Sequence, residues 1–241
     1  MPLMFKFAKD LISRMIEVYA IKILPENEFL KLKNKFLSLL PSEVNQMMQK
    51  FRMVNVLQRS LFGELMTRQI LADKLKRETN SFIFNKMEKG KPYLEGNPVY
   101  FNISHSGEWV VAAFCNSVEV GIDVEKIKKV NFEIAERFFS KKEKMELFAK
   151  TGDEKLRYFF DLWTLKESYL KLLGKGLTKP LNTFTVTGNN GKFLLLNDND
   201  EVRNVCFKQY GIEKNYKISV CSYANEFQDG IKIVYAEDLL K

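Results

Sequence analysis

Histidine and cysteine are both scarce in this 241-residue sequence, which limits the kinds of site that it can build. His105 is the single histidine, and the three cysteines, Cys115, Cys206 and Cys221, are widely spaced without a Cys-x-x-Cys pair. An odd number of separated cysteines predicts neither a disulfide framework nor a structural zinc site. This cysteine usage fits a reducing, cytoplasmic compartment best.

Long apolar runs are missing as well. A membrane-spanning helix needs about 20 consecutive apolar residues. Charged side chains interrupt the apolar residues between positions 1 and 24, namely Lys6, Lys9, Asp10, Arg14, Glu17 and Lys22. We therefore expect neither a signal sequence nor a membrane anchor, and we expect residues 1–14 to form an extension outside the core.

The Gly-x-Ser-x-Gly motif of the α/β-hydrolases is also absent. His105 lies directly beside Ser104 and Ser106, and a histidine next to its serine in sequence is poorly placed to act as the base of that serine. These two observations exclude a serine-hydrolase site.

The composition is that of a globular protein with a basic surface. Hydrophobic residues make up 46% of the chain, and 38 Lys and Arg against 30 Asp and Glu give a net charge of +8. Two interpretations of that charge stay open, an acidic or phosphate-rich partner and a solvated basic surface.

Hydrophobic spacing predicts an α+β fold without repeats. Helical periodicity covers residues 26–40, 54–76, 140–150 and 153–173. Strand-like runs cover residues 17–24, 81–84, 99–103, 109–114, 118–124, 184–187, 192–196, 202–209, 217–223 and 231–235. Short connections favour antiparallel pairing. We expect two halves, residues 15–117 and 118–241, each a small, mainly antiparallel sheet packed with helices.

Three polar islands, in residues 101–107, 121–126 and 163–171, suggest one assembled site. In the second island, Asp123 and Glu125 stand two apart on a predicted strand, so both project from the same face. Converging carboxylates suit a divalent cation, whereas a solvated strand end is the plain alternative. Alternation with the apolar Ile122 and Val124 favours the cation site.

In the third island, Glu167 and Lys171 stand four apart on a predicted helix. A surface ion pair of this kind is worth only about 0.2 to 0.5 kcal/mol. Trp163, another four residues earlier, lies on the same stripe and implies that Glu167 is partly buried. A half-buried carboxylate needs a cation nearby.

The remaining candidates each have a structural alternative. The turn around Ser104 and His105 suits phosphate oxygens, although His105 is equally able to bond to backbone. Lys91, between Gly90 and Pro92, is either a positioned ammonium or a solvated loop lysine. Ser140 and Glu143 match a capping box at a helix start, a role that leaves open a second function for Glu143.

These islands resemble the 4′-phosphopantetheinyl transferases, specifically the large monomeric, surfactin-synthetase-activating type. The resemblance runs from about residue 17 to residue 240 and is sharpest in FNISHSGEWVVAAF, VGIDVEKI, RFFSKKE and LWTLKESYLKLLGKGL. It implies a monomeric pseudo-dimer of two similar halves with coenzyme A bound between them. It also implies that the partners are apo acyl or peptidyl carrier proteins. It implies no nucleic-acid partner and no membrane partner.

The resemblance implies a reaction and a role for each candidate. Mg²⁺, or Mn²⁺ in its place, held by Asp123, Glu125 and Glu167 binds the pyrophosphate, and a carrier serine attacks the β-phosphate and releases adenosine 3′,5′-bisphosphate. Phosphoryl transfer of this kind needs positioning and charge neutralisation. By resemblance, the residues that contact phosphate and nucleotide are Ser104, His105, Lys91 and Lys171. The base stays open between Glu167, a metal-bound water and Glu143.

Two positions depart from the family pattern. Val44 and Met47 stand where some members place lysines for the 3′-phosphate, which leaves Arg59 and Lys50 as candidate replacements. The family also implies an acidic carrier, and the segment from residue 137 to 150 offers it lysines and aromatic rings. These are Phe138, Phe139, Lys141, Lys142, Lys144 and Phe148.

Two alternative functions remain. One is another Mg²⁺-dependent phosphotransferase that acts on a nucleotide. The other is a basic nucleic-acid-binding module that uses the charge and the 20 phenylalanines for backbone contacts and base stacking. Most of these rings follow apolar periodicity, which favours a place in the core.

Overall fold

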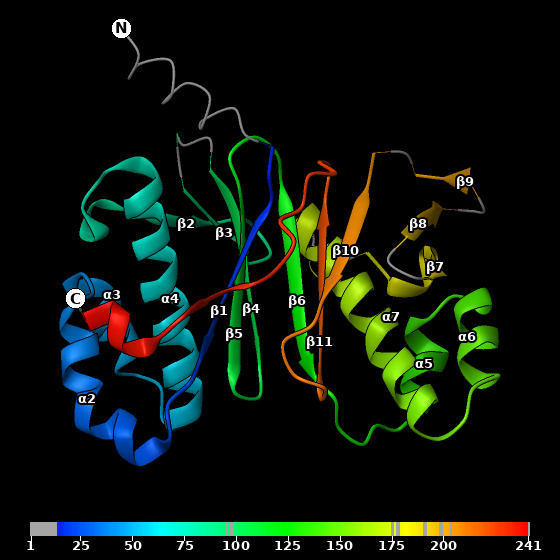
Figure 1. Cartoon of the computed structure of the whole chain (residues 1–241), viewed down its shortest axis with the longest axis horizontal. Helices are drawn as coiled ribbons and strands as arrows, with labels where there is room; N and C mark the ends of the chain where they lie inside the picture. The colour runs from blue at the N-terminus through cyan, green and yellow to red at the C-terminus, as the bar shows by residue number, and fades with distance from the viewer. Residues whose placement is uncertain are drawn as a thin grey trace, which may run out of the picture.

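The chain folds into four layers, with two sheets face to face in the middle and helices outside both (Figure 1). This structure is a computed structural model that describes residues 14–94, 96, 99–174, 176, 179–189, 192–197, 200–202 and 204–240. The predicted extension lies outside the described residues except for Arg14. Two helix-covered sheets confirm the predicted α+β class and its organisation in two halves.

The first half is built on a four-stranded sheet in the order β12-β1-β5-β4. Its strands are β1 (Glu17–Lys22), β4 (Tyr100–Ser106), β5 (Trp109–Cys115) and β12 (Lys232–Val234). The helices α2 (Glu26–Ser38), α3 (Ser42–Met48) and α4 (Val54–Leu75) cover its outer face. The pairs β1–β5 and β5–β4 are antiparallel, as expected.

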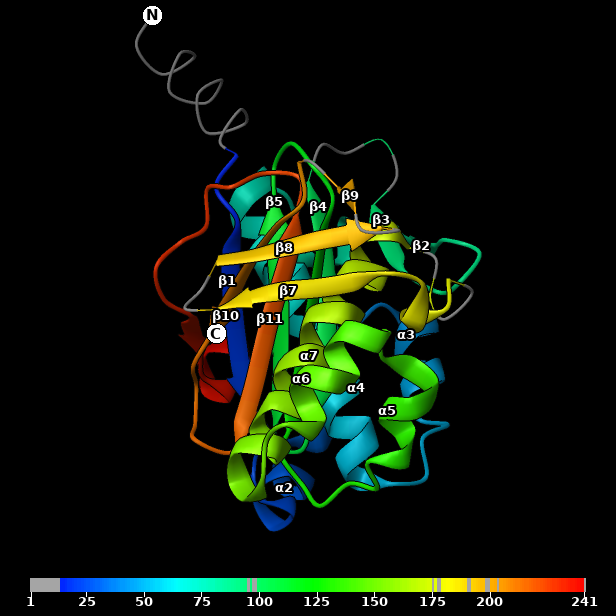
Figure 2. The same ribbon diagram turned by 90° about the vertical axis from the view of Figure 1, so that its right-hand side faces the viewer.

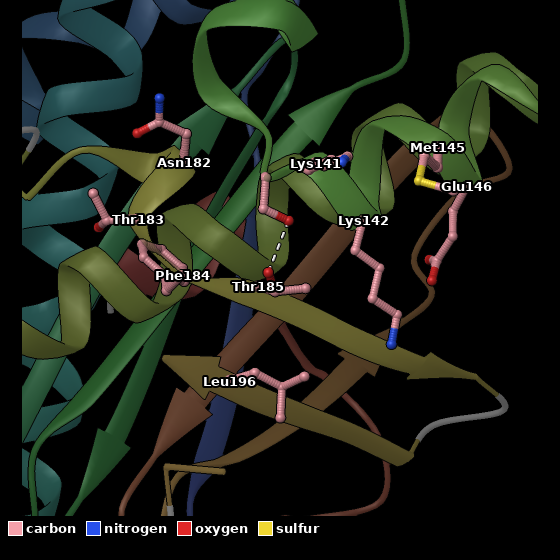
Figure 3. Close-up of a pocket in the computed structure, with 10 residues that line it drawn as sticks. Lys141, Lys142, Met145, Glu146, Asn182, Thr183, Phe184, Thr185 and Leu196 are labelled. Carbon is pink, nitrogen blue, oxygen red and sulfur yellow. Dashed lines mark hydrogen bonds between the residues drawn. The ribbon is translucent and has the colours of Figure 1, made fainter. Parts of the chain in front are cut away.

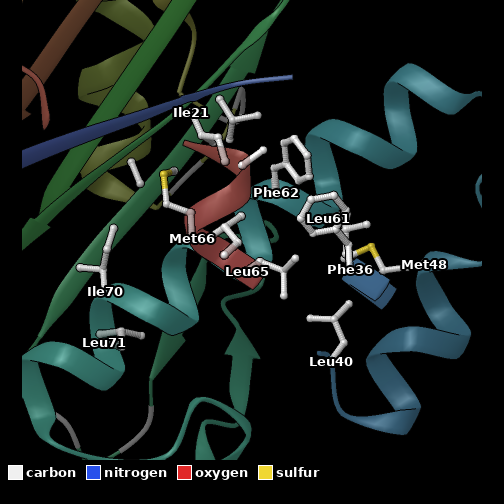
Figure 4. Close-up of a cluster of buried hydrophobic side chains, with 14 of the residues drawn as sticks. Ile21, Phe36, Leu40, Met48, Leu61, Phe62, Leu65, Met66, Ile70 and Leu71 are labelled. Atoms are coloured by element: carbon white, nitrogen blue, oxygen red, sulfur yellow. The ribbon is translucent and has the colours of Figure 1, made fainter. Parts of the chain in front are cut away.

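A dense apolar core joins these helices to the sheet (Figure 4). The predicted stripe of α4 supplies Leu61 and Leu65, which lie in one cluster with Phe36 of α2 and with Val110 and Phe114 of β5. Burial of such side chains contributes about 1.5 to 3 kcal/mol each. This core fixes α4, and with it Arg59, against the sheet.

The end of the chain differs from the predicted division at residue 118. β12 runs parallel to β1, with Tyr19 opposite Lys232 and Ile21 opposite Val234. The following turn η4 (Ala236–Leu240) then adds Leu239 to the core of the first half. The pairing covers the edge of β1, and an apolar run alone does not reveal which edge it will cover.

The second half has a three-stranded antiparallel sheet in the order β10-β11-β6. Its strands are β6 (Val120–Lys126), β10 (Cys206–Tyr210) and β11 (Tyr216–Ser222). The helix α7 (Gly152–Leu173) packs on this sheet, and α5 (Glu133–Phe138) and α6 (Lys141–Phe148) pack against α7. A separate sheet crosses over it, with β7 (Thr185–Asn189), β8 (Lys192–Asn197) and β9 (Asp200–Glu201) (Figure 2).

Several predicted boundaries shift in the structure. The run 81–84 is divided between the 3₁₀ turn η1 (Thr79–Ser81) and β2 (Phe84–Lys86), which pairs with the unexpected β3 (Pro92–Leu94). The helix α5 and the turn η3 (Leu181–Thr183) were not expected either. All of these elements are too short for apolar residues to recur over several periods, which is the signal that predicts a helix or strand.

The two halves meet along an apolar layer and a polar seam. Ala113 of β5 and Ile122 of β6 belong to the cluster between the facing sheets. At the sheet edges, the backbone N–H groups of Ile122, Val124 and Lys126 donate to side chains of β4. The acceptors are Asn102 Oδ1 at 3.0 Å, Ser104 Oγ at 3.3 Å and Ser106 Oγ at 3.1 Å, and we call these three residues the seam.

Two smaller observations concern the cysteines and the helices of the described residues. Cys115, Cys206 and Cys221 are all free thiols. Among the helices of the described chain, none has the length and apolar character needed to cross a bilayer.

Candidate functional site

A cleft of about 340 Å³ opens beside the seam, between β4, β6 and α7. It is lined by Ile103, Ser104, His105, Asp123, Glu125, Trp163, Glu167 and Lys171. The structure thus brings the three polar islands of the sequence together at the junction of the two halves.

Gly121 sets the distance between β6 and α7. A Cβ atom at this position would lie 2.1 Å from the Ser168 carbonyl oxygen and 2.3 Å from the Leu172 nitrogen. The helix backbone therefore rests directly on the strand, which only glycine permits. At this short separation, Glu167 and Lys171 on one stripe of α7 lie over the carboxylates of β6.

Asp123 is the most enclosed carboxylate of the cleft, with 4% of its surface exposed. Its Oδ1 accepts hydrogen bonds from Lys171 Nζ at 2.6 Å and from Ser104 Oγ at 3.0 Å. Its Oδ2 is buried without a hydrogen-bond partner among the described residues. Such an oxygen is costly unless a further group binds it.

Glu125 and Glu167 add two more carboxylates to the same cleft. Burial raises the pKa of Glu125, although Ser106 Oγ donates to its Oε2 at 2.7 Å and opposes that rise. Burial also raises the pKa of Glu167 to about 7; the charge of Asp123 adds to the rise and Lys171 opposes it. Glu167 is partly buried, as the position of Trp163 predicted. The three carboxylates repel one another and favour a cation.

His105 lines the cleft on the side of the first half, and the charge of Arg59 acts on its imidazole. Partial enclosure lowers the pKa of His105, and the positive charges of Arg59 and Lys171 lower it further. Arg59 donates from Nη1 to the Gly107 carbonyl at 3.1 Å, and its Nε is buried without a partner in the described part of the chain. His105 borders the cleft, and Arg59 keeps an unpaired donor among the described residues.

Lys91 does not reach this cleft. Its ammonium has three donors. They meet Glu119 Oε2 at 2.5 Å, the Val120 carbonyl at 3.1 Å and the Leu172 carbonyl at 3.2 Å. Burial lowers its pKa. Lys91 therefore ties the turn between β2 and β3 to β6 and α7, which is a structural role.

Glu143 lies apart from the cleft, fully buried at the start of α6. It forms the predicted capping box with Ser140 and accepts a hydrogen bond from the Val186 N–H at 2.8 Å. Its two oxygens also bind Lys166 Nζ at 2.6 and 2.7 Å. Lys166 belongs to the third polar island but received no role from the sequence, because its neighbours Leu165 and Glu167 gave no sign that it points into the core.

Comparisons with known proteins assign the family. A model of the 4′-phosphopantetheinyl transferase superfamily matches residues 119–221, and one of the 4′-phosphopantetheinyl transferase N-terminal region matches residues 27–117. A solved holo-(acyl-carrier-protein) synthase of Bacillus anthracis in complex with CoA aligns with 44% of this chain and 94% of its own. That likeness, with 20% identity and a TM-score of 0.38, is too slight to carry an inference.

Curated relatives extend over most of the chain. 4′-Phosphopantetheinyl transferase Sfp of Bacillus subtilis (strain 168) is 36% identical over 207 residues, which is 86% of this chain and 92% of the relative. 4′-Phosphopantetheinyl transferase gsp of Aneurinibacillus migulanus is 39% identical over 211 residues, with 86% of each chain covered. Because both halves match in order and the identity is spread over 86% of its length, the chain belongs to the 4′-phosphopantetheinyl transferase family.

Proposed function

We propose that this protein transfers the 4′-phosphopantetheine arm of coenzyme A to a serine hydroxyl of an apo acyl or peptidyl carrier protein. The second product is adenosine 3′,5′-bisphosphate. The observation that carries the proposal is the cleft at the junction of the halves, where Asp123, Glu125, Glu167 and Lys171 gather in a chain of this family. The cysteine usage supports a cytoplasmic location, and the family supports a monomer.

A divalent cation, Mg²⁺ or Mn²⁺, is part of the proposal. Asp123, Glu125 and Glu167 offer the oxygen ligands that such ions prefer, and Asp123 Oδ2 is buried without a partner among the described groups. These residues fit in donor type; within the described chain, no three His, Cys, Asp or Glu side chains form a ready-made metal-ion site. When bound, the cation supplies charge neutralisation to the pyrophosphate.

The side chains of the cleft supply the other requirements of the reaction. Lys171 and His105 bind phosphate oxygens, and Arg59 adds positive charge near His105. Glu167, directly or through a metal-bound water, is the proton acceptor for the carrier serine, because its carboxylate lines the cleft beside Lys171. Glu143, the other candidate base, is fully buried and bonded on both oxygens, so its role is structural.

A neighbouring cleft of about 380 Å³ is our candidate site for the nucleotide end of coenzyme A. It shares Ile103 with the cleft that Asp123 lines. Val44 and Met47 line it, as do the cations Arg68 and Lys86. Arg68 is buried and bonded to Glu64 and to two carbonyls, so Lys86 is the free cation among the described lining residues. We assign the 3′-phosphate contact to Lys86 rather than to Lys50 or Arg59.

The carrier surface centres on α6. Phe139 is buried, Phe138 packs edge-on against Trp163, and Phe148 is 44% exposed beneath the ammonium of Lys155. A groove of about 580 Å³ lies beside α6, and Lys141, Lys142 and the exposed Met145 line it (Figure 3). We propose this part of α6 for the acidic carrier, with Met145 and Phe148 as the apolar contacts.

The test is intact mass spectrometry of several apo carrier proteins after incubation with coenzyme A and Mg²⁺, with a chelator as control. A mass gain of one phosphopantetheine confirms the transfer. A gain of phosphate alone supports the alternative nucleotide phosphotransferase. Salt-sensitive oligonucleotide binding without any binding of coenzyme A supports the nucleic-acid alternative.

A further inference from the structure

The seam joins two strands that belong to different sheets. β4 is the last strand of one sheet and β6 is the last strand of the other. Side chains of alternate β4 residues, rather than its backbone, accept the N–H groups of alternate β6 residues. This arrangement places the hydroxyl groups of Ser104 and Ser106 next to the carboxylates that β6 carries.

Two seam residues make a second hydrogen bond. A serine hydroxyl has one proton to donate and accepts through its lone pairs. Ser106 accepts the Lys126 N–H at 3.1 Å and donates to Glu125 Oε2 at 2.7 Å. Ser104 likewise donates to Asp123, but it also accepts a hydrogen bond from Lys171. A change at Ser104 would therefore disturb both Asp123 and Lys171.

Ser106 holds Glu125 without competition from other described groups. Lys217 is opposite Glu125 on β11, yet its ammonium binds Asp161 instead. The bond from Ser106 is the one hydrogen bond to the Glu125 carboxylate in the described part of the chain, and it uses Oε2 alone. Glu125 Oε1 is then available to a further ligand.

We propose that Ser106 is a positioning residue that orients the Glu125 carboxylate for the divalent cation. The inference rests on the cation site of the proposed function. Groups that hold a metal-binding side chain in place typically change metal affinity by about 10- to 100-fold when they are removed. Ser106 acts through Glu125 and does not itself line the cleft.

Asn102 provides a matched control. It lies on the same strand and makes the same kind of seam bond, from the Ile122 N–H to its Oδ1 at 3.0 Å. Among the described residues, it makes no hydrogen bond to a carboxylate of the cleft. Loss of either side chain weakens the junction of the halves, but only loss of the Ser106 hydroxyl releases Glu125.

The experiment measures Mn²⁺ binding to the full chain without coenzyme A, by electron paramagnetic resonance and calorimetry. Ser106→Ala should raise the Kd for Mn²⁺ about 10-fold. Ser106→Thr keeps the hydroxyl and should restore affinity. Asn102→Ala should lower Tm and leave the Kd unchanged. In a Glu125→Gln background, Ser106→Ala should cause no further loss.

Two results would overturn the inference and leave the proposed function intact. One is wild-type affinity in folded Ser106→Ala; the other is an equal rise in Kd in Asn102→Ala. Failure of the wild type to bind Mn²⁺, or equal binding by Asp123→Asn, would overturn the cation site and the inference together. If Ser106→Ala does not fold, Ser106→Cys supplies the same test, because a thiol is a weak donor of similar size.

Discussion

Among single residues, Lys171 occupies a position that a metal ion would share. Its Nζ lies 2.6 Å from Asp123 Oδ1, so the ammonium neutralises a carboxylate that the cation is proposed to bind. Lys171→Met should therefore tighten Mn²⁺ binding about five-fold, in line with about 1 kcal/mol for a partly exposed ion pair. The same variant should lose transfer rate by about 10²-fold or more, because Lys171 stabilises charge on phosphate.

Calorimetry and turnover measured on the same protein sample check whether Lys171→Met binds Mn²⁺ more tightly and transfers more slowly than wild type. Lys232→Met, which removes an exposed lysine paired with Glu17, controls for the change in net charge. Weaker Mn²⁺ binding by Lys171→Met would show that the lysine orders Asp123 instead of competing for it.

Glu167 should make the metal-free protein less stable as the pH rises. Its pKa is raised from 4.5 to about 7 in the folded state, so between these values the folded chain holds a proton that the unfolded chain has released. Stability from this group is therefore full below about pH 4.5 and is lost as the pH rises through about 7. Glu167→Gln should melt above wild type at pH 8, with the difference gone near pH 4.5.

Thermal melts in the presence of a chelator between about pH 4.5 and 8 test whether stability falls as the pH rises. Glu133→Gln, which changes an exposed carboxylate of α5, is the control. The transfer rate of Glu167→Gln should fall even where its melting temperature rises, because Glu167 is the proposed base. A Glu167→Gln protein that is less stable than wild type at pH 8 would contradict the raised pKa.

Among the elements, the contact of α7 with β6 holds the site together. Gly121→Ala places a Cβ against the backbone of Ser168 and Leu172, so the helix must move away from the strand. We expect a loss of about 1 to 3 kcal/mol in unfolding free energy and a loss of transfer larger than the stability change explains. Gly211→Ala, where a Cβ meets no atom within 4 Å, is the matched control. Equal activity in the two variants would refute the role of this contact.

The buried pair of Lys166 and Glu143 joins α7 to the start of α6. Lys166→Met leaves a buried carboxylate without its partner and should cost about 3 to 5 kcal/mol of stability. Adding Glu143→Gln should recover part of this loss, because the amide oxygen still accepts backbone N–H groups. Denaturant unfolding and turnover per folded molecule measure both effects. A well-folded but inactive double variant would return Glu143 to the list of candidate bases.

Sequence periodicity predicted the central residues of the site, because each pair follows the repeat of one element. Asp123 and Glu125 follow the two-residue repeat of a strand, and Glu167 and Lys171 follow the turn of a helix. Lys91 could not be placed in this way, since its partners come from β6 and α7 and depend on how a short hairpin packs. The local sequence pattern also does not show which way a lysine side chain points, so it did not predict the burial of Lys166.

At the scale of the whole molecule, the halves are less separate than the sequence suggested. The chain returns from the second half to add β12 to the sheet of the first. The cleft then lies at a junction fixed by the apolar layer, by the seam and by this returning strand. Such a junction limits independent motion of the halves, which suits a site with ligands from both.

The net charge of +8 should govern how fast an acidic carrier arrives. Raising the salt concentration from about 50 to 500 mM shortens the Debye length from roughly 14 to 4 Å, so association should slow while dissociation changes little. Charge reversal of Lys141 and Lys142, which line the groove beside α6, should raise the carrier KM more than the coenzyme A KM. Stopped-flow association and steady-state kinetics measure these effects, with reversal of the exposed Lys31 and Lys35 on α2 as a control of equal net charge. If both double variants raise the carrier KM equally, overall charge and not the α6 surface guides the carrier.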